Sequence, residues 1–178
     1  MIVYLLRHGT PVGGRMYRGN LFDDPLTEEG WDQMKSSVAD LSFDTIATSP
    51  MKRCSEFADY ISKKLKIPYS IIEDFKEIGF GEWQGKSPDE IGRDVVLRFK
   101  KNPLKNPIEN AESIYEFSKR VLVEFNKITQ LPPSNKNVLL VAHAGVIRVI
   151  LSYYKKNPIE EMFNINVRNG ELIKLELE

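Results

Sequence analysis

The chain has 178 residues, enough for a substantial hydrophobic core, and we expect residues 1–178 to form a single domain. Hydrophobic residues make up 42% of the chain and charged residues 28%, which is typical of a globular protein and excludes a disordered one. Twenty-five Lys and Arg balance 25 Asp and Glu, so no overall field would recruit nucleic acid or an acidic membrane surface.

The chain has one cysteine, Cys54, which excludes an intrachain disulfide and a zinc-ribbon arrangement. The apolar segment 1–6 is too short to span a membrane, and it lacks the basic region and cleavage site of a signal peptide. We therefore expect a cytoplasmic protein that binds neither membranes nor nucleic acid. No sequence feature indicates the oligomeric state.

The first half of the chain is predicted to alternate strands with helices. In chain order we expect a strand over 2–6, a loop over 9–26, a helix over 27–41, a strand over 44–48, a helix over 49–65 and a strand over 69–72. Thr27 and Ser49 should cap the two helices, with Pro50 at the first position of the second. A loop as long as 9–26 inside a compact domain is usually functional.

The second half contains the most apolar predicted strand. In chain order we expect a loop over 79–85, short helical pieces over 88–101, a long helix over 114–128, a strand over 138–142, a helix over 144–154 and a β-hairpin over 162–167 and 172–177. The unbroken apolar run 138–142 is typical of a central strand covered on both sides. Together these elements predict an α/β fold: a three-layer α/β/α sandwich with a mostly parallel sheet and an antiparallel hairpin at one edge.

The two histidines of the chain occupy the same kind of position. His8 and His143 each directly follow an apolar strand, and each has a glycine within two residues. Because the carboxyl ends of strands line the ligand crevice of open α/β sheets, the two imidazoles meet there if strands 2–6 and 138–142 are neighbours. Taken singly, either histidine is more often structural, but the shared position favours a functional pair.

Arginine side chains lie close to these histidines or to a predicted helix start. Arg7 precedes His8, and Arg53 falls in the first turn of its helix, where free N–H groups and the helix dipole favour an anion. A guanidinium group matches two oxygens of a phosphate. Taken alone, Arg53 and Glu77 would be ordinary surface residues, so their interpretation depends on the motifs around them.

Five short motifs follow one another in an order that resembles the histidine phosphatase superfamily, which includes the cofactor-dependent phosphoglycerate mutases. They are Leu6-Arg7-His8-Gly9-Thr10, Pro25-Leu26-Thr27-x-x-Gly30, Ser49-Pro50-x-x-Arg53, Glu77-x-x-x-Gly81-x-Trp83-x-Gly85 and His143-x-Gly145. One tripeptide would be weak evidence, whereas five motifs in order over nearly the whole chain are specific. The resemblance implies a phosphoglycerate mutase-like fold.

The resemblance also implies a phosphatase that works through a phosphohistidine and needs no metal or other cofactor. His8 would be the nucleophile, and Glu77 would serve as general acid and then as general base. Nearby cations should keep the imidazole of His8 neutral. The groups that would bind the phosphate are Arg7, Arg53, His143 and Ala144. The expected partner is a small-molecule phosphate monoester.

Several segments narrow the resemblance to the alpha-ribazole phosphatases of cobalamin biosynthesis; these are 13–19, 23–34, 80–85 and 145–148. They imply removal of the 5′-phosphate from alpha-ribazole phosphate or adenosylcobalamin phosphate. Arg15, Tyr17 and Arg18 would contact the rest of the substrate, unless they belong to a solvated loop. Ala111 stands where related proteins carry a glycine.

Other functions fit some of these features. A broad-specificity or sugar-phosphate phosphatase is the alternative, while the short chain, Thr10-Pro11 and Gly14 argue against a phosphoglycerate mutase. A non-catalytic phosphate-binding protein of the same fold would not need a nucleophile. A metal site at the two histidines lacks an evident third ligand, although Glu77 or an Asp residue could supply one.

Overall fold

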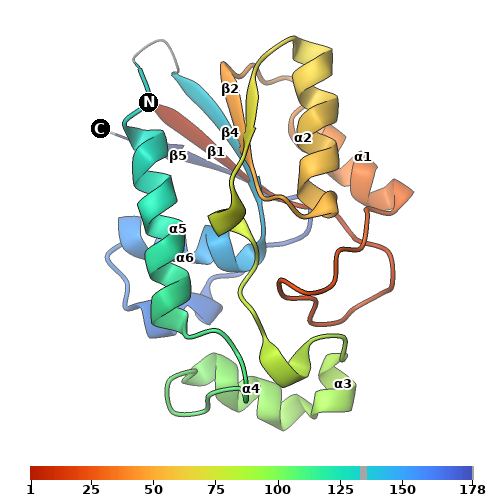
Figure 1. Ribbon diagram of the computed structural model, residues 1–178, viewed down its shortest axis with the longest axis vertical. Helices are drawn as coiled ribbons and strands as arrows, with labels where there is room; N and C mark the ends of the chain where they lie inside the picture. The colour runs from red at the N-terminus through yellow and green to blue at the C-terminus, as the bar shows by residue number, and fades with distance from the viewer. Residues whose placement is uncertain (133–135, 178) are drawn as a thin grey trace.

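A five-stranded sheet forms the centre of the computed structural model, which describes residues 1–132 and 136–177 (Figure 1). The strands are β1 (Ile2–Arg7), β2 (Thr45–Thr48), β3 (Tyr69–Ile71), β4 (Asn137–Ala142) and β5 (Leu172–Glu176). Their order in the sheet is β3-β2-β4-β1-β5, and only the pairing of β5 with β1 is antiparallel among these strands. The predicted mostly parallel sheet is confirmed, and β1 lies beside β4.

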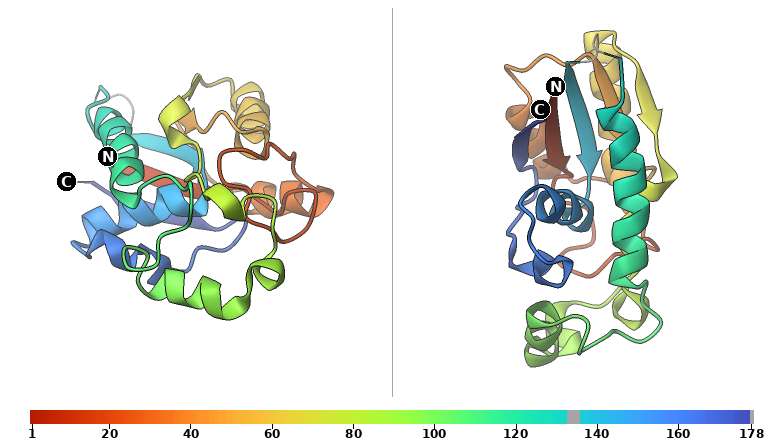
Figure 2. Two further views of the ribbon diagram at one scale, coloured as in Figure 1. Left: turned by 60° about the horizontal axis from the view of Figure 1, so that its bottom comes forward. Right: turned by 90° about the vertical axis from the view of Figure 1, so that its left-hand side faces the viewer.

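Helices cover both faces of this sheet (Figure 2). They are α1 (Glu28–Ser37), α2 (Lys52–Leu65), α3 (Pro88–Ile91), α4 (Arg93–Lys101), α5 (Ile114–Thr129) and α6 (Ala144–Tyr154). Successive residues of a strand point to opposite faces, so β4 contributes to both layers. Val138 and Leu140 pack with apolar residues of α5 and α6, whereas Leu139 and Val141 pack with those of α1 and α2. The three-layer sandwich is confirmed.

The long first loop and the pair α3–α4 lie beyond the C-terminal ends of the parallel strands (Figure 1). The loop is pinned by bridges between Pro11 and Leu26 and between Tyr17 and Gln84. Its Arg18 side chain is buried, and Nε donates to the Asp24 carboxylate at 2.8 Å. The edge of the sheet where ligands bind in α/β folds is therefore flanked by an ordered loop and a helical cap.

The start of α2 differs from the prediction. Ser49 is not its N-cap: Met51 takes that position and the helix begins at Lys52, so Pro50 precedes it. The hydroxyl of Ser49 instead accepts the N–H of Met51 at 3.3 Å and lies 2.7 Å from Nε2 of His143. The hydroxyl of Ser49 therefore contacts His143, at the end of β4, instead of capping α2. The other predicted cap, Thr27, is confirmed, although α1 ends at Ser37 instead of near Leu41.

The prediction of a C-terminal hairpin is also wrong for its first strand. Residues 162–167 form no strand, because Ile159–Asn164 is a 3₁₀-helix, and β5 pairs with β1 instead. The carbonyl groups that follow have other partners: that of Ile165 accepts from Arg148 at 2.9 Å and that of Val167 from Arg7 at 2.7 Å. These arginine contacts replace the ladder of hydrogen bonds that a second hairpin strand would make.

Candidate active site

Strands β1 and β4 bring both histidines to one edge of the sheet. Arg7 pairs in register with Ala142, so the next residue of each strand is a histidine. The N–H of His8 donates to the carbonyl of Ala142 at 3.0 Å, and the two imidazole centroids lie 5.2 Å apart. The juxtaposition expected from two neighbouring strand ends is observed.

The hydrogen bond of His8 defines which of its nitrogens can react. Nδ1 lies 2.8 Å from the carbonyl oxygen of Gly9. A carbonyl can only accept, so Nδ1 carries the proton and Nε2 of the neutral ring keeps its lone pair. Burial holds the pKa of His8 well below its ordinary value, and the charges of Arg53 and Arg7 lower it further. The ring is therefore a neutral nitrogen base near pH 7.

The segment after β1 is held by close backbone packing and by one amide. A Cβ on Gly9 would collide with the backbone of Gly30, and a Cβ on Gly30 would collide with that of Thr10. The side-chain amide of Asn169 donates to the carbonyl groups of Gly9 at 3.0 Å and His8 at 3.3 Å. Sequence reasoning missed Asn169, because its Asn-Gly pair indicated only a hairpin turn.

Arg7 and Arg53 are anchored by backbone carbonyls rather than by carboxylates. Arg7 donates to Val167 at 2.7 Å, and Arg53 donates to Phe22 at 2.7 Å and to Gly19 at 3.0 Å. Within residues 1–132 and 136–177 neither forms an ion pair, and Nε of each is buried without a hydrogen-bond partner. Burial lowers the pKa of Arg7 to about 10, which keeps it protonated at neutral pH. Two positive charges without an ion-pair contact among the described residues therefore lie beside His8.

A single carboxylate, Glu77, is fixed at the same place. One oxygen accepts the N–H of Gly145 at 3.1 Å, at the start of α6, and the other accepts the N–H of Ile78 at 3.0 Å. A carboxylate is favoured beside the first turn of a helix by the free N–H groups and the helix dipole. Glu77 can therefore exchange a proton with a group bound near His8.

The approach of Glu77 requires glycine at position 145. A Cβ on Gly145 would collide with the carboxylate of Glu77. We expect Gly145→Ala to displace this carboxylate and to lower the free energy of unfolding by about 1–3 kcal/mol, less the gain in helix propensity of about 1 kcal/mol. Urea denaturation measures the change. In a Glu77→Ala background the same substitution should cost much less, and an equal cost in both backgrounds would contradict this account.

His143 is placed differently from the other expected site residues. Its imidazole is fully buried, its Nε2 contacts Ser49 Oγ, and Cys54 Sγ lies 3.8 Å from that same nitrogen. Burial and the charge of Arg53 lower the pKa of His143, while burial raises the pKa of the Cys54 thiol to about 12. Both groups are neutral, and neither is among the residues that line the cavity containing His8.

A cavity of about 500 Å³ joins the remaining expected residues. Its lining includes Arg7, His8, Arg15, Tyr17, Arg18, Arg53, Glu77 and Ala144, but not His143. Lys100 on α4 and Arg148 on α6 also line it. Lys100 was not singled out from the sequence, because a single basic residue on a helix gives no local signal of function, and Arg148 appeared there only as the last residue of the segment 145–148. The volume lies in the range of small-molecule sites, roughly 300–1,000 Å³.

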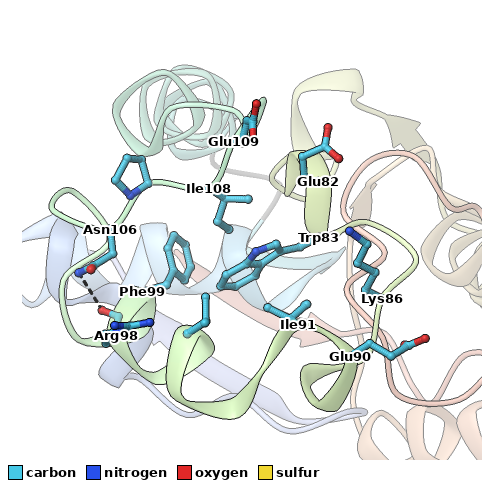
Figure 3. A pocket seen from close by; sticks show the side chains of 12 residues that line it. Glu82, Trp83, Lys86, Glu90, Ile91, Arg98, Phe99, Asn106, Ile108 and Glu109 are labelled. Carbon is cyan, nitrogen blue, oxygen red and sulfur yellow. Dashed lines mark hydrogen bonds between the residues drawn. The ribbon is translucent and has the colours of Figure 1, made fainter.

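A second and larger cavity, about 590 Å³, lies on the outer side of the cap (Figure 3). Trp83, Phe99 and Ile108 form its apolar wall, and charged side chains such as Glu82 and Lys86 lie at its rim. None of the described residues that line it is a histidine. Trp83 is buried and packs edge-on against Tyr17, with ring centroids 5.2 Å apart, so it separates the two cavities. The reactive groups line the cavity that contains His8, whereas this second cavity contains none of them.

Three features lie at the C-terminal edge of the parallel sheet: a neutral imidazole with a free lone pair, fixed guanidinium groups and a carboxylate. Together they define the class of α/β proteins that bind a phosphoryl group. The sequence profile of the histidine phosphatase superfamily (branch 1) matches residues 3–178. The chain belongs to this family, which confirms the resemblance seen in the motifs.

Curated relatives include phosphatases with several names. "Putative phosphoserine phosphatase 2" of Hydrogenobacter thermophilus is 30% identical over 99% of this chain and 89% of its own length. "Uncharacterized phosphatase PhoE" of Bacillus subtilis is 34% identical over 84% of this chain and 75% of its own. The adenosylcobalamin/alpha-ribazole phosphatase of Escherichia coli is 25% identical over 96% of this chain and 87% of its own.

Solved structures show the same fold. YhfR of Bacillus stearothermophilus superposes with a TM-score of 0.87 at 24% identity, covering 99% of this chain and 91% of that chain. A mycobacterial glucosyl-3-phosphoglycerate phosphatase superposes with a TM-score of 0.86 at 22% identity, covering 98% and 89%. The chain is therefore similar in fold to both proteins.

Phosphatases of this type act without metal cofactors. Across residues 1–132 and 136–177, no group of three or more His, Cys, Asp or Glu side chains is arranged to hold a metal ion. The same residues include no helix with the length and apolar character needed to cross a membrane.

Proposed function

We propose that the chain hydrolyses phosphate monoesters through a phosphohistidine on Nε2 of His8. The observation that carries the proposal is the hydrogen bond from Nδ1 of His8 to the Gly9 carbonyl, which leaves the Nε2 lone pair available beside Arg7 and Arg53. A protein that only bound phosphate would need the arginines but not this tautomer.

In the first step, Nε2 attacks phosphorus, the N–P bond forms and the bond from phosphorus to the ester oxygen breaks. Glu77, in its protonated form, gives its proton to that oxygen, so the alcohol leaves neutral. In the second step a water molecule attacks phosphorus, Glu77 takes the water proton and the N–P bond breaks. Inorganic phosphate leaves and His8 is restored as a neutral ring.

Arg7 and Arg53 stabilise the charge on the transferring group. Phosphoryl transfer passes through a loose transition state, so positioning and charge stabilisation supply most of the catalysis. Carbonyl groups hold both guanidinium groups in place before substrate binds. A contact of His143 with the phosphoryl group stays a prediction, since it requires Nε2 to exchange its contact with Ser49.

For the physiological ester, the sequence segments and the relative from Escherichia coli support alpha-ribazole 5′-phosphate or adenosylcobalamin 5′-phosphate. The relative from Hydrogenobacter thermophilus and the mycobacterial structure instead support phosphoserine or a glycosylated phosphoglycerate. Arg15 and Tyr17 line the cavity and are proposed to contact the non-phosphate part. Arg18 also lines it, but its pairing with Asp24 gives it a structural role in the loop.

Chemical trapping tests the reaction type. Denaturing the protein during turnover of a ³²P-labelled ester should leave a label that is stable in base and labile in acid, as expected for phosphohistidine. Hydrolysis should continue undiminished in EDTA. A label stable in acid, or activity lost in EDTA and restored by a divalent cation, would contradict the proposal.

A further inference from the structure

Three basic side chains from separate segments line the candidate cavity in addition to Arg7 and Arg53. Arg15 comes from the first loop, Lys100 from the end of α4 and Arg148 from α6. None of the three forms an ion pair within the described ranges 1–132 and 136–177. Three like charges at one cavity are unfavourable unless solvent or an anion compensates them.

Arg148 is held in position rather than free in solvent. Its Nε donates to the carbonyl of Ile165 at 2.9 Å, and its guanidinium carbon lies 5.6 Å from the ring centroid of Phe163. Cation–π contact with a ring favours a fixed guanidinium. Within the described ranges no hydrogen bond engages its terminal nitrogens, so these donors stay available to a ligand in the cavity.

These cations extend the positive charge of the cavity beyond the arginines that act on the nucleophile. Besides burial, the charges that lower the pKa of His8 are those of Arg53, Arg7 and Arg18. The pKa of Lys100 is lowered by burial and then by Arg148 and Arg15. Arg148 also lowers the pKa of Arg7, so the positive charge of the cavity runs from the arginines beside His8 through Arg148 to Lys100 and Arg15.

Apolar side chains line the cavity around Arg15, Lys100 and Arg148. Tyr17, Phe80 and Phe163 line the same cavity, and Tyr17 packs edge-on against Phe80 with ring centroids 5.0 Å apart. In the described part of the chain, Glu77 is the only carboxylate of the lining, and the N–H groups of Gly145 and Ile78 engage it. Glu77 therefore cannot neutralise all three cations.

We propose that Arg148, Lys100 and Arg15 form a second anion subsite that selects phosphate monoesters carrying a carboxylate or a second phosphate. The subsite rests on the proposed phosphatase function and names its substrate class. Alpha-ribazole 5′-phosphate ranks below such esters, because its benzimidazole riboside part carries no second negative charge and leaves the three cations unpaired.

A matched pair of esters tests the subsite. 3-Phosphoglycerate and glycerol 3-phosphate differ only in a carboxylate against a hydroxymethyl group. We expect kcat/KM to be about tenfold or more higher for 3-phosphoglycerate, since charge-assisted hydrogen bonds are about twice as strong as neutral ones and a tenfold change needs only about 1.4 kcal/mol. Lys100→Gln should lower kcat/KM for 3-phosphoglycerate about tenfold and change that for glycerol 3-phosphate less than about twofold.

Lys101→Gln is the matched control, because Lys101 is the next residue of α4, is exposed and does not line the cavity. Lys101→Gln should leave kcat/KM unchanged for both esters. Arg15→Gln combined with Lys100→Gln should bring the kcat/KM values of the two esters close to each other. The subsite is overturned if the unmodified protein has equal kcat/KM for the two esters, or if Lys100→Gln lowers kcat/KM equally for both. In either case, hydrolysis of p-nitrophenyl phosphate would still support the phosphatase function. Absence of hydrolysis of all three esters and of label on His8 overturns both.

Discussion

His8→Ala is expected to lower kcat by about 10⁴–10⁶-fold, because loss of a nucleophile removes the covalent route altogether. Steady-state hydrolysis of p-nitrophenyl phosphate measures this loss. The acid-labile label should disappear with the activity, since no other neutral imidazole lines the cavity within the described residues. Normal turnover in this variant would mean that water attacks the ester directly and that His8 has another role.

The His8→Ala protein should still fold, which makes its loss of activity interpretable. The Gly9 carbonyl that accepts from His8 Nδ1 also accepts from the amide of Asn169, so it keeps a partner in the variant. Loss of one buried hydrogen bond costs about 1–3 kcal/mol, a fraction of the stability of a typical domain. Circular dichroism and a urea titration provide the control. An unfolded variant would be replaced by His8→Gln, which keeps a polar side chain of similar size.

The parts of the fold that were predicted correctly depend on local patterns. Apolar runs ending in a histidine located β1 and β4, and the order of strands and helices indicated a parallel sheet. Once these strands are adjacent, covalent geometry alone brings His8 and His143 together. The meeting of the two histidines was therefore predictable, because it follows from strand ends rather than from side-chain detail.

The errors concern groups whose partners are far away in the sequence. The carbonyl of Val167 accepts a hydrogen bond from Arg7, 160 residues earlier. The segment around Val167 has the sequence pattern of a hairpin strand, but it contacts this arginine instead of pairing with a strand. Ser49 has the composition of a helix cap, yet its hydroxyl contacts His143, 94 residues later. Nothing near either residue in the sequence encodes these distant partners.

The orientation of side chains was equally beyond the sequence. The sequence locates His143 at a strand end, but nothing in it indicates that the ring contacts Ser49 and the thiol of Cys54. Its contact with the phosphoryl group stays a prediction. Lys100 and Arg148 enter the cavity only because α4 and α6 are folded over the same strand ends. The candidate phosphoryl site and Arg15 could thus be inferred from the sequence, whereas the placement of Lys100 and Arg148 at the cavity required the tertiary structure.

Glu77→Gln is expected to have an effect that depends on the leaving group. Esters of simple alcohols need a proton on the departing oxygen, so kcat should fall about 10²–10⁴-fold, the usual contribution of general acid–base catalysis. p-Nitrophenolate leaves without a proton, so its release in the first step should change little. Pre-steady-state measurement of p-nitrophenol should show a burst, followed by slow turnover as phosphohistidine waits for unassisted attack by water.

The side-chain amide introduced by Glu77→Gln also separates chemistry from structure. It keeps one acceptor for the N–H of Gly145 or Ile78 but loses the other, so a modest decrease in stability accompanies the change. Glu82→Gln is the control, because it makes the same chemical change at an exposed carboxylate on the rim of the outer cavity, away from His8. It should leave the hydrolysis rates of both esters unchanged. A structural defect would lower the alkyl and nitrophenyl reactions alike and would not accumulate phosphohistidine. A burst with trapped label therefore assigns proton transfer to Glu77, whereas a first step slowed equally for both esters, with no burst, would assign it elsewhere.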